Sequence, residues 1–429
     1  MTSLFLVSPH RTLPPLSFTP LSKSLQLPPR CQIQTRARIE AQLTASTSES
    51  ERGVEFTTGD LFYRRESATA RDLAILSSSI SHRHLGRGLR VLDAMCGCAV
   101  RSVRYLSQGG AEFVWANDAF EGCRPRILAN LSSAAPRFSR DARRWVVTHF
   151  HANRLFSECY LQKEFFDLVD IDSFGGDSSF LRSALCVVKI GGLLYLTSTD
   201  GRSSGGHRPS RSLASYGAYV RPMPFSNEIG LRMLIGGAVR EASALGFHVS
   251  PVFSYYSYHG PVFRVMLQLG NGKDDHMSRY GFIGYCNKCG HSQTFSWDEL
   301  GQISCPCGST KVVVSGPLWT GPLHSAENVR EMLELAREWG WAYTNSKNDD
   351  LDKLLNLMID ECDPQLPPGY IKVDEIARRA KVNSPPVSTL IHALQVEGYA
   401  ASRSHVEPNA IKTNCPMASC INFVLKIRT

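Results

Sequence analysis

The chain has 429 residues, of which 43% are hydrophobic and 20% charged, values that fit a globular protein of two or three domains. No run reaches the ~18 uninterrupted apolar residues of a membrane-spanning helix, so we expect no membrane partner. The formal net charge is +8, but five of these charges lie in residues 1–39, which leaves +3 for residues 40–429. The net charge is therefore only weak evidence for a nucleic-acid partner.

Residues 1–39 contain no Asp or Glu and are rich in Ser, Thr and Pro. Their basic residues are Arg11, Lys23, Arg30, Arg36 and Arg38. This composition is typical of a transit peptide, which we place at residues 1–45. The Ser and Pro content favours the chloroplast, with the mitochondrion as the alternative; a disordered tail is the non-functional interpretation. A Ser/Thr/Glu-rich link follows at about residues 40–52.

An α/β fold is predicted from the order of apolar runs and turns after this link. Residues 89–94 form a buried strand, the turn Cys96–Ala99 follows, and a helix begins near Val100. A strand, a tight turn and a helix N-terminus make a cradle for a cofactor, to which Asp93 and Gly97 belong. The turn lacks the full G-x-G-x-x-G fingerprint, so it is a weak signal for a dinucleotide.

The next predicted strand, residues 112–118, ends in Asp118, 25 positions after Asp93. Nucleotide-binding sheets commonly place a carboxylate here against the ribose hydroxyls. Asp118 is therefore the candidate ribose ligand, and a turn-forming Asp at a strand end is the structural alternative.

The remaining elements alternate between strands and helices. Strands are predicted at 145–150, 165–172, 193–199, 247–255 and 261–269, and helices at 180–189 and 228–245. The alternation predicts a parallel sheet, and the short turn between the last two strands makes them antiparallel neighbours. This arrangement resembles the seven-stranded Rossmann-like sheet of class I S-adenosylmethionine-dependent methyltransferases. Hydride transfer on a nicotinamide is the competing interpretation, but it lacks the glycine fingerprint for a pyrophosphate.

The strand at residues 165–172 is the most informative of the series. Its apolar residues are those of a strand buried on both faces, and Gly175–Gly176 end it. In open α/β sheets ligands bind beyond the carboxyl ends of the strands. We therefore expect Asp172 to accept protons there and Phe174 to stack on a flat ring. A turn-capping Asp beside a core Phe is the structural alternative.

The stretch Asp172-Ser173-Phe174-Gly175 resembles the Asp-Pro-Phe-Gly motif of the tRNA guanosine-26 N2-dimethyltransferase family. Other segments between residues 52 and 415 resemble this family too: Phe62–Tyr63, Arg71–Asp72, Val100–Tyr105, Asn117–Asp118, Thr197–Asp200, Glu228 with Leu231–Arg232, Phe263–Val265, Gly316–Leu323 and Ile411–Thr413. By this resemblance the chain is identified as a member of the family, of a plant organellar type.

The resemblance implies a cofactor and its ligands. Arg71, Arg101 and Asp118 would contact S-adenosylmethionine, and Ala152 would lie beside its adenine. A surface position and a helix-face position are the alternatives for the two arginines. The family usually carries an acid where this chain has His151, so a carboxylate contact to the adenine amino group is missing.

The resemblance also implies the reaction, which is methyl transfer to the exocyclic N2 of guanosine 26 in tRNA, giving N2-methyl- and N2,N2-dimethylguanosine. Asp172, helped by the backbone carbonyl of Ser173, would hold the amino group and take up its proton. Phe174 would stack on the extruded base. Ser173 replaces the family's proline, so the turn loses a fixed φ.

Two cysteine pairs suggest a metal site. Cys286 and Cys289 are followed, after fifteen intervening residues, by Cys305 and Cys307, and each pair precedes a glycine. Four thiolates in this arrangement suit structural Zn²⁺, with His291 as a reserve ligand and unliganded cysteines as the alternative. The second pair is C-x-C, tighter than the usual C-x-x-C.

Residues 365–415 are predicted to contain a winged helix-turn-helix, with helices at 373–380 and 387–396. Its candidate phosphate ligands are Arg378, Arg379, Lys381, Arg403, Lys412 and His405. A solvated basic surface is the structural alternative, and the family resemblance favours tRNA.

The sequence therefore predicts a transit peptide at 1–45, a methyltransferase domain at 50–270 and a tRNA-binding C-terminal domain at 275–429. The last is an α+β domain with a four-cysteine zinc knuckle at 280–315 and the winged-helix-like part at 365–415. No obligate protein partner is evident. The alternatives are a noncatalytic organellar RNA-binding or chaperone protein on the same scaffold, and an N2-guanine methyltransferase acting on another RNA.

Overall fold

The computed structural model describes residues 48–134, 144–176, 178–272, 278–309, 311–343 and 350–427. The transit segment predicted at residues 1–45 lies outside these ranges. The described elements belong to one compact unit, Ser46–Thr429. In this part of the chain, no helix is both long enough and apolar enough to cross a bilayer.

A seven-stranded sheet carries the first half of the chain. Its strands are β3 (Leu89–Asp93), β4 (Ala111–Asn117), β5 (Trp145–Thr148), β6 (Phe166–Asp172), β7 (Val188–Ser198), β8 (Phe247–Ser257) and β9 (Val262–Asn271). The strand order is β5-β4-β3-β6-β7-β9-β8. The first five are parallel, whereas β9 is antiparallel to both β7 and β8. The predicted terminal hairpin is confirmed.

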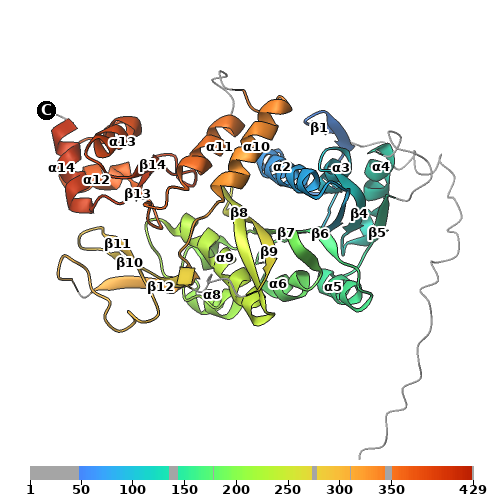
Figure 1. Cartoon of the computed structure of the whole chain (residues 1–429), viewed down its shortest axis with the longest axis horizontal. Helices are drawn as coiled ribbons and strands as arrows, with labels where there is room; N and C mark the ends of the chain where they lie inside the picture. The colour runs from blue at the N-terminus through green and yellow to red at the C-terminus, as the bar shows by residue number, and fades with distance from the viewer. Residues whose placement is uncertain are drawn as a thin grey trace, which may run out of the picture. The chain divides into compact units, whose positions relative to one another are not determined.

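Helices cover both faces of this sheet (Figure 1). One face holds α2 (Ala68–Leu85), α3 (Val100–Ser107) and α4 (Arg124–Ala134), and the other holds α5 (Ala152–Leu161), α6 (Ser178–Leu185) and α9 (Ser226–Ala244). The alternation along β6 fits this burial, since Leu168 packs into the first core and Val169 and Ile171 pack into the second.

Two short helices, α7 (Gly201–Ser204) and α8 (Pro209–Tyr216), lie between β7 and α9 in the chain. The prediction of helix up to residue 189 is wrong, because β7 begins at Val188 and Phe166 pairs with it. The β-branched side chain of Val188 favours this strand over another helical turn.

The link predicted at residues 40–52 also contains structure. Strands β1 (Ser48–Glu51) and β2 (Val54–Thr57) form an antiparallel hairpin, followed by the 3-10 turns η1 (Arg65–Ser67) and, after β4, η2 (Glu121–Cys123). The polar composition of β1 gave no apolar alternation from which a strand could be predicted.

The C-terminal half contains two small antiparallel sheets. The first has the order β11-β10-β12 and contains β10 (Tyr280–Cys286), β11 (Ser292–Phe295) and β12 (Val312–Trp319). The second has the order β13-β15-β14 and contains β13 (Ile371–Lys372), β14 (Ala401–Arg403) and β15 (Ala410–Thr413). The helices are α10 (Ala326–Glu338), α11 (Asp350–Asp360), α12 (Val373–Ala380), α13 (Val387–Val396) and α14 (Met417–Ile427). Helices α12 and α13 with the β14–β15 wing match the predicted winged-helix arrangement.

A buried ion cluster ties α9 to the C-terminal half. We call Glu228, Arg232 and Lys412 the Glu228 cluster. Glu228 accepts hydrogen bonds from Arg232 Nε (2.8 Å), Lys412 Nζ (2.7 Å) and the backbone N–H of Gly369 (2.6 Å). Burial alone would raise the pKa of Glu228, but the cations of Lys412 and Arg232 outweigh it and lower the pKa to about 2.

Candidate active site

The loop after β6 is held in place by β7. The Gly175 N–H donates to Thr199 Oγ1, and the Thr199 N–H donates to the Gly175 carbonyl, both at 2.7 Å. Ser173 Oγ donates to the Thr197 carbonyl at 3.0 Å. These bonds fix the loop between Asp172 and Gly175 without the proline that the family motif would place there.

All eight residues predicted to bind the cofactor or to act in catalysis line a single cavity of about 890 Å³. They are Arg71, Asp93, Gly97, Arg101, Asp118, Ala152, Asp172 and Phe174. Arg71 and Arg101 come from α2 and α3, and the other six lie at or just after the carboxyl ends of the parallel strands β3, β4, β5 and β6. The structure thus brings together residues that are up to about a hundred positions apart in sequence, and their individual roles stay predictions.

Asp118, at the end of β4, is oriented by backbone donors. Its Oδ2 accepts from the Gly97 N–H and its Oδ1 from the Phe120 N–H, both at 2.9 Å. Each carboxylate oxygen keeps acceptor capacity beyond these bonds. The side chain is therefore fixed beside the turn that contains Gly97. Its oxygens can still accept hydrogen bonds from hydroxyl groups such as those of a ribose.

Asp93, at the end of β3, is a buried carboxyl with one unused oxygen. Its Oδ2 accepts from Ser102 Oγ at 2.6 Å, whereas its Oδ1 has no hydrogen-bond partner among the described residues. Burial, reinforced by the charge of Asp170, raises the pKa of Asp93 to about 8. A cationic donor such as an ammonium group fits this open acceptor.

Asp172 is held by a buried arginine. Arg101 Nη1 donates to Asp170 Oδ1 at 2.7 Å, and its Nη2 lies 2.9 Å from Asp172 Oδ2 in an ion pair without hydrogen-bond geometry. Tyr105 Oη donates to the other oxygen of Asp170 at 2.8 Å. Arg101 therefore sets the position of the Asp172 carboxylate through a network anchored in α3.

The Asp172 side chain is 39% exposed toward the cavity. Burial would raise the pKa of Asp172, but the nearby cations of Arg101, Arg264 and Arg71 lower it below its ordinary value. The group is therefore charged at neutral pH and accepts hydrogen bonds from an amine.

Glu51 in β1 is a site residue that sequence reasoning missed. It accepts from Arg71 Nε at 2.9 and 3.0 Å, from Arg104 Nη1 at 3.0 Å and from Tyr63 Oη at 2.6 Å. It neutralises two buried guanidinium groups behind the cavity and thereby fixes Arg71. Local pattern carried no signal for it, because its partners are distant in sequence.

Two exposed aromatic rings face each other at the cavity. Phe174 is 75% exposed and Phe62 is 63% exposed. Their ring centroids are 5.2 Å apart in an edge-to-face arrangement, and both line the cavity. In the sequence, Phe62 stands out only as part of the segment Phe62–Tyr63 that resembles the family. Large exposed rings beside a cavity are suited to stacking on a flat ligand.

Ala152 is buried at the start of α5, and His151 precedes it as the N-cap residue. The imidazole ring of His151 lies 5.9 Å from the Phe180 ring. Both rings line the cavity. His151 and Phe180 therefore give the cavity an aromatic surface at the position where the family resemblance led us to expect an acid.

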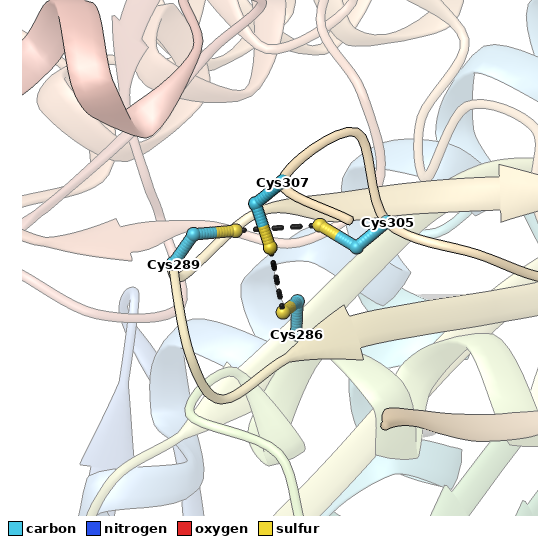
Figure 2. A group of neighbouring side chains, drawn as sticks. All are labelled: Cys286, Cys289, Cys305 and Cys307. Carbon is cyan, nitrogen blue, oxygen red and sulfur yellow. Dashed lines mark hydrogen bonds between the residues drawn. The ribbon is translucent and has the colours of Figure 1, made fainter. Parts of the chain in front are cut away.

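The four predicted metal-ligating cysteines converge on one point (Figure 2). Their sulfur atoms lie within 4.8 Å of one another, with 3.7 Å between Cys286 and Cys307 and 3.3 Å between Cys289 and Cys305. Two tight turns present them, one between β10 and β11 and one in the connection from β11 to β12. Gly290 and Gly308 in these turns have φ of 81° and 74°, where side chains are disfavoured. The donor set and its spacing fit a tetrahedral Zn²⁺.

His291 is not among the converging side chains; its carbonyl accepts from the Cys286 N–H at 2.9 Å. A second group of side chains close enough together to ligate a metal ion consists of His324, Glu361 and His405. In this group the Ser254 N–H donates to His324 Nδ1 at 3.2 Å. The neutral ring must therefore carry its proton on Nε2, which leaves that atom unable to ligate a metal.

Of the six basic residues predicted to contact phosphate, three are exposed and three are held by other groups of the protein. Arg378, Lys381 and Arg403 are exposed. Lys412 is buried in the Glu228 cluster, and His405 Nδ1 lies 2.9 Å from Glu361 Oε2. Arg379 is occupied by Glu375 and by the Lys288 carbonyl of the first cysteine turn. The last three are held within the protein, Lys412 and His405 by buried carboxylates and Arg379 by a partly buried carboxylate and a backbone carbonyl.

Comparisons with known proteins agree with this geometry. A sequence model of the family described as N2,N2-dimethylguanosine tRNA methyltransferase matches residues 41–425. The chain is 29% identical over 376 residues to the tRNA (guanine(26)-N(2))-dimethyltransferase of Pyrococcus abyssi, covering 85% of this chain and 92% of that protein. It is 30% identical over 372 residues to the enzyme of the same name from Thermococcus kodakarensis, covering 83% and 90%.

A solved structure also resembles the chain over most of its length. It is that of Trm1 from Pyrococcus horikoshii in complex with S-adenosyl-L-methionine, with a TM-score of 0.74 and 27% identity. The alignment covers 88% of this chain and 99% of the other. Together with the family match, which spans nearly the whole described region, this shows that the chain belongs to the N2,N2-dimethylguanosine tRNA methyltransferase family.

Proposed function

We propose that this protein transfers methyl groups from S-adenosyl-L-methionine to the exocyclic N2 of guanosine 26 in tRNA, giving N2-methyl- and N2,N2-dimethylguanosine. The observation that carries the proposal is the position of Asp172. Its charged carboxylate ends β6 inside the cavity, with the exposed ring of Phe174 two residues further on. The names and functions of the related proteins support the same reaction.

The reaction requires Asp172 to orient the guanine amine and to accept one proton. The methyl donor supplies an electrophilic methyl group on a sulfonium, and the guanine amine must present its lone pair to it. Asp172 accepts a hydrogen bond from the amine and thereby orients that lone pair. After the N–C bond forms, the nitrogen is cationic and strongly acidic, so a carboxylate with a lowered pKa is a sufficient base for the released proton.

The aromatic rings supply the second requirement, which is to hold a flat base. A target nucleotide leaves its stack to reach such a cavity. Phe174 and Phe62 provide exposed ring faces at the cavity, and stacking on each is worth about 1–3 kcal/mol. On the cofactor side, Asp93 and Asp118 offer acceptors to an ammonium group and to hydroxyls.

The test is methylation of defined RNA. Purified full-length protein is incubated with S-adenosyl-L-methionine and unmodified tRNA transcripts carrying guanosine or adenosine at position 26, and the nucleosides are analysed by mass spectrometry. We expect N2-methyl- and N2,N2-dimethylguanosine only with guanosine at that position. Absence of product with retained tRNA binding would support a noncatalytic RNA-binding protein, and product only with ribosomal RNA would move the target.

We propose that the four-cysteine site binds structural Zn²⁺. Arg379 links the first cysteine turn to α12, because it donates to the Lys288 carbonyl at 3.0 Å and to Glu375 at 2.8 Å. Metal analysis of the purified protein should give one zinc per chain, and Cys307→Ser should lower this content. Cys186→Ser, which changes a cysteine outside the cluster, is the matched control. Full zinc content in the Cys307 variant would contradict the assignment.

We propose that the winged-helix part contacts tRNA phosphates through its exposed cations Arg378, Lys381 and Arg403. Recognition of this kind depends on RNA shape and charge and weakens with salt. Substitution of all three by Gln should lower tRNA affinity and reduce its salt dependence, while affinity for the methyl donor stays the same.

We propose a chloroplast location for the mature protein, in keeping with a plant organellar member of the family. The support is the acid-free, Ser- and Pro-rich composition of residues 1–39. Residues 1–45 fused to a fluorescent protein should direct it to chloroplasts. Import into mitochondria would instead support the alternative.

A further inference from the structure

A row of three side chains crosses the sheet at the cavity. Asp172 of β6 pairs in register with Thr197 of β7, and Thr197 pairs in register with Arg264 of β9. Residues paired across adjacent strands project from the same face of a sheet. All three line the cavity, so Asp172 and Arg264 face it about 10 Å apart at their backbones, two strand spacings.

Arg264 is a buried cation without a directly paired carboxylate. It is 3% exposed, and its Nη1 and Nη2 donate to Ser257 Oγ and Ser67 Oγ, both at 3.0 Å. Its Nε has no hydrogen-bond partner, and no carboxylate lies within 4.0 Å of the guanidinium among the described residues. A buried charge in this situation is costly unless a ligand completes it. Burial accordingly lowers the pKa of Arg264.

The two other buried arginines that line the cavity differ in this respect. Arg71 is paired with Glu51, and Arg101 is paired with Asp170 and Asp172. Thr197, between Asp172 and Arg264, also has a buried Oγ1 without a hydrogen-bond partner in the described part of the chain. The side of the cavity beyond Asp172 therefore offers donors and acceptors that the protein itself does not use.

The strand order separates this side from the cofactor residues. Asp93, Asp118 and Ala152 follow β3, β4 and β5, which lie on one side of β6. Thr197 and Arg264 belong to β7 and β9 on its other side. A ligand atom that accepts from Arg264 is therefore expected to come from the methyl acceptor rather than from the methyl donor.

We propose that Arg264 is a specificity-determining residue that donates a hydrogen bond to O6 of the target guanine while Asp172 holds its N2 amine. This inference rests on the proposed function. The N2 amine, a donor, and O6, an acceptor, lie at opposite ends of the Watson–Crick edge of guanine. The row Asp172–Thr197–Arg264 presents an acceptor at one end and a donor at the other, which is the complementary order.

The experiment compares two target bases that share the reacting amine. 2-Aminopurine keeps the N2 amine of guanine but lacks O6 and the N1 proton. A tRNA ligated with 2-aminopurine at the target position therefore differs from the guanosine tRNA only in these two features. We expect the wild-type protein to prefer guanosine by at least about 100-fold in kcat/KM, since a site built for a hydrogen bond rejects an analogue that lacks it. In Arg264→Met this preference should fall below about tenfold, because the variant loses a hydrogen bond only with the guanosine substrate and kcat/KM falls only for that substrate.

The different intrinsic reactivities of the two bases cancel when the preference of the wild-type protein is divided by that of the variant. Arg264→Lys keeps a buried donor at similar volume and should retain an intermediate preference, so it tests the proposal if Arg264→Met does not fold. Arg90→Met is the matched control, because Arg90 lies on the same sheet outside the cavity and pairs with Glu164; its preference should equal the wild-type value.

Two results would overturn the proposal. One is an equal loss on both bases in the Arg264 variants, which would make the residue structural. The other is an unchanged preference with at least tenfold weaker binding of S-adenosyl-L-methionine, measured by calorimetry, which would assign Arg264 to the donor. Failure of the proposed function is distinct, since the wild-type protein would then not methylate the guanosine tRNA.

Discussion

The cavity and the Glu228 cluster both bury charged side chains, but they differ in how those charges are satisfied. In the Glu228 cluster, the carboxylate accepts three hydrogen bonds, from two cations and one backbone amide. In the cavity, Asp93 Oδ1, Thr197 Oγ1 and Arg264 Nε make none within the described residues. A satisfied cluster holds elements together, whereas unsatisfied groups facing a cavity indicate a ligand.

This difference leads to opposite expectations for mutations. A change in the cavity should alter chemistry or ligand binding with little effect on the free energy of unfolding. A change in the Glu228 cluster should alter the free energy of unfolding first.

The largest effect is expected for Asp172→Ala, which removes the group that orients the amine and accepts its proton. The rate of methyl transfer should fall about 10³-fold or more, while tRNA affinity stays the same. The free energy of unfolding should change by less than about 1 kcal/mol, since the partly exposed carboxylate is not needed to hold the fold. Single-turnover kinetics and urea unfolding measure the two quantities, and near-normal turnover would exclude the proposed role.

Lys412→Met removes one of the two cations from buried Glu228 and should destabilise the protein by about 3 kcal/mol in urea unfolding. The double variant Glu228→Gln with Lys412→Met should recover part of this loss, because no unpaired charge then remains.

The same cluster predicts a pH dependence. The folded-state pKa of Glu228 is about 2, below its ordinary value of 4.5. Its stabilisation, about 3 kcal/mol from this difference, is therefore present above pH 4.5 and is lost as the pH falls toward 2. Relative to wild type, Glu228→Gln should show a smaller decrease in the free energy of unfolding over this range. An identical decrease in both proteins would contradict the assignment.

Phe174→Ala should lower kcat/KM for tRNA about 10- to 100-fold, because one stacked base loses a ring face worth about 1–3 kcal/mol. Binding of S-adenosyl-L-methionine should not change. Tyr160→Ala, at an exposed aromatic residue of α5 that does not line the cavity, is the control and should be silent. Equal effects of the two substitutions would mean that Phe174 acts only as exposed surface.

The smallest effect concerns Asp93, whose pKa of about 8 keeps the carboxyl mostly protonated at pH 7 when the cavity is empty. An ammonium group placed against Oδ1 would lower this pKa, so binding of S-adenosyl-L-methionine should release up to about one proton. Calorimetry at pH 7 in two buffers of different ionisation enthalpy measures the release. Asp93→Asn should abolish it, and an unchanged release in that variant would point to another group.

Much of the fold was predictable because buried parallel strands leave short, mainly apolar runs, as between Phe166 and Ile171, where four of the six residues are apolar. The acids at the ends of such runs, Asp93, Asp118 and Asp172, could be placed in one crevice by the rule that ligands bind at the carboxyl ends of strands. The structure places all of them along the same cavity.

The remaining features depend on contacts between distant parts of the chain. Lys412 was expected to be a phosphate ligand, but its partner Glu228 lies 184 positions away. Arg264 could have been noticed as a charged residue inside the apolar strand Val262–Leu269, yet its relation to Asp172 follows only from the pairing of β6, β7 and β9. No local pattern contains such a register.

The hairpin β1–β2 limits where the proposed transit peptide could be cleaved. Glu51 lies only a few residues after the segment predicted to be removed on import, and it is the counter-charge for Arg71 and Arg104. A processing peptidase that cut beyond this glutamate would leave two guanidinium groups behind the cavity without their shared carboxylate. For the transit peptide that we propose at residues 1–45, we therefore expect the cleavage site to lie before Glu51.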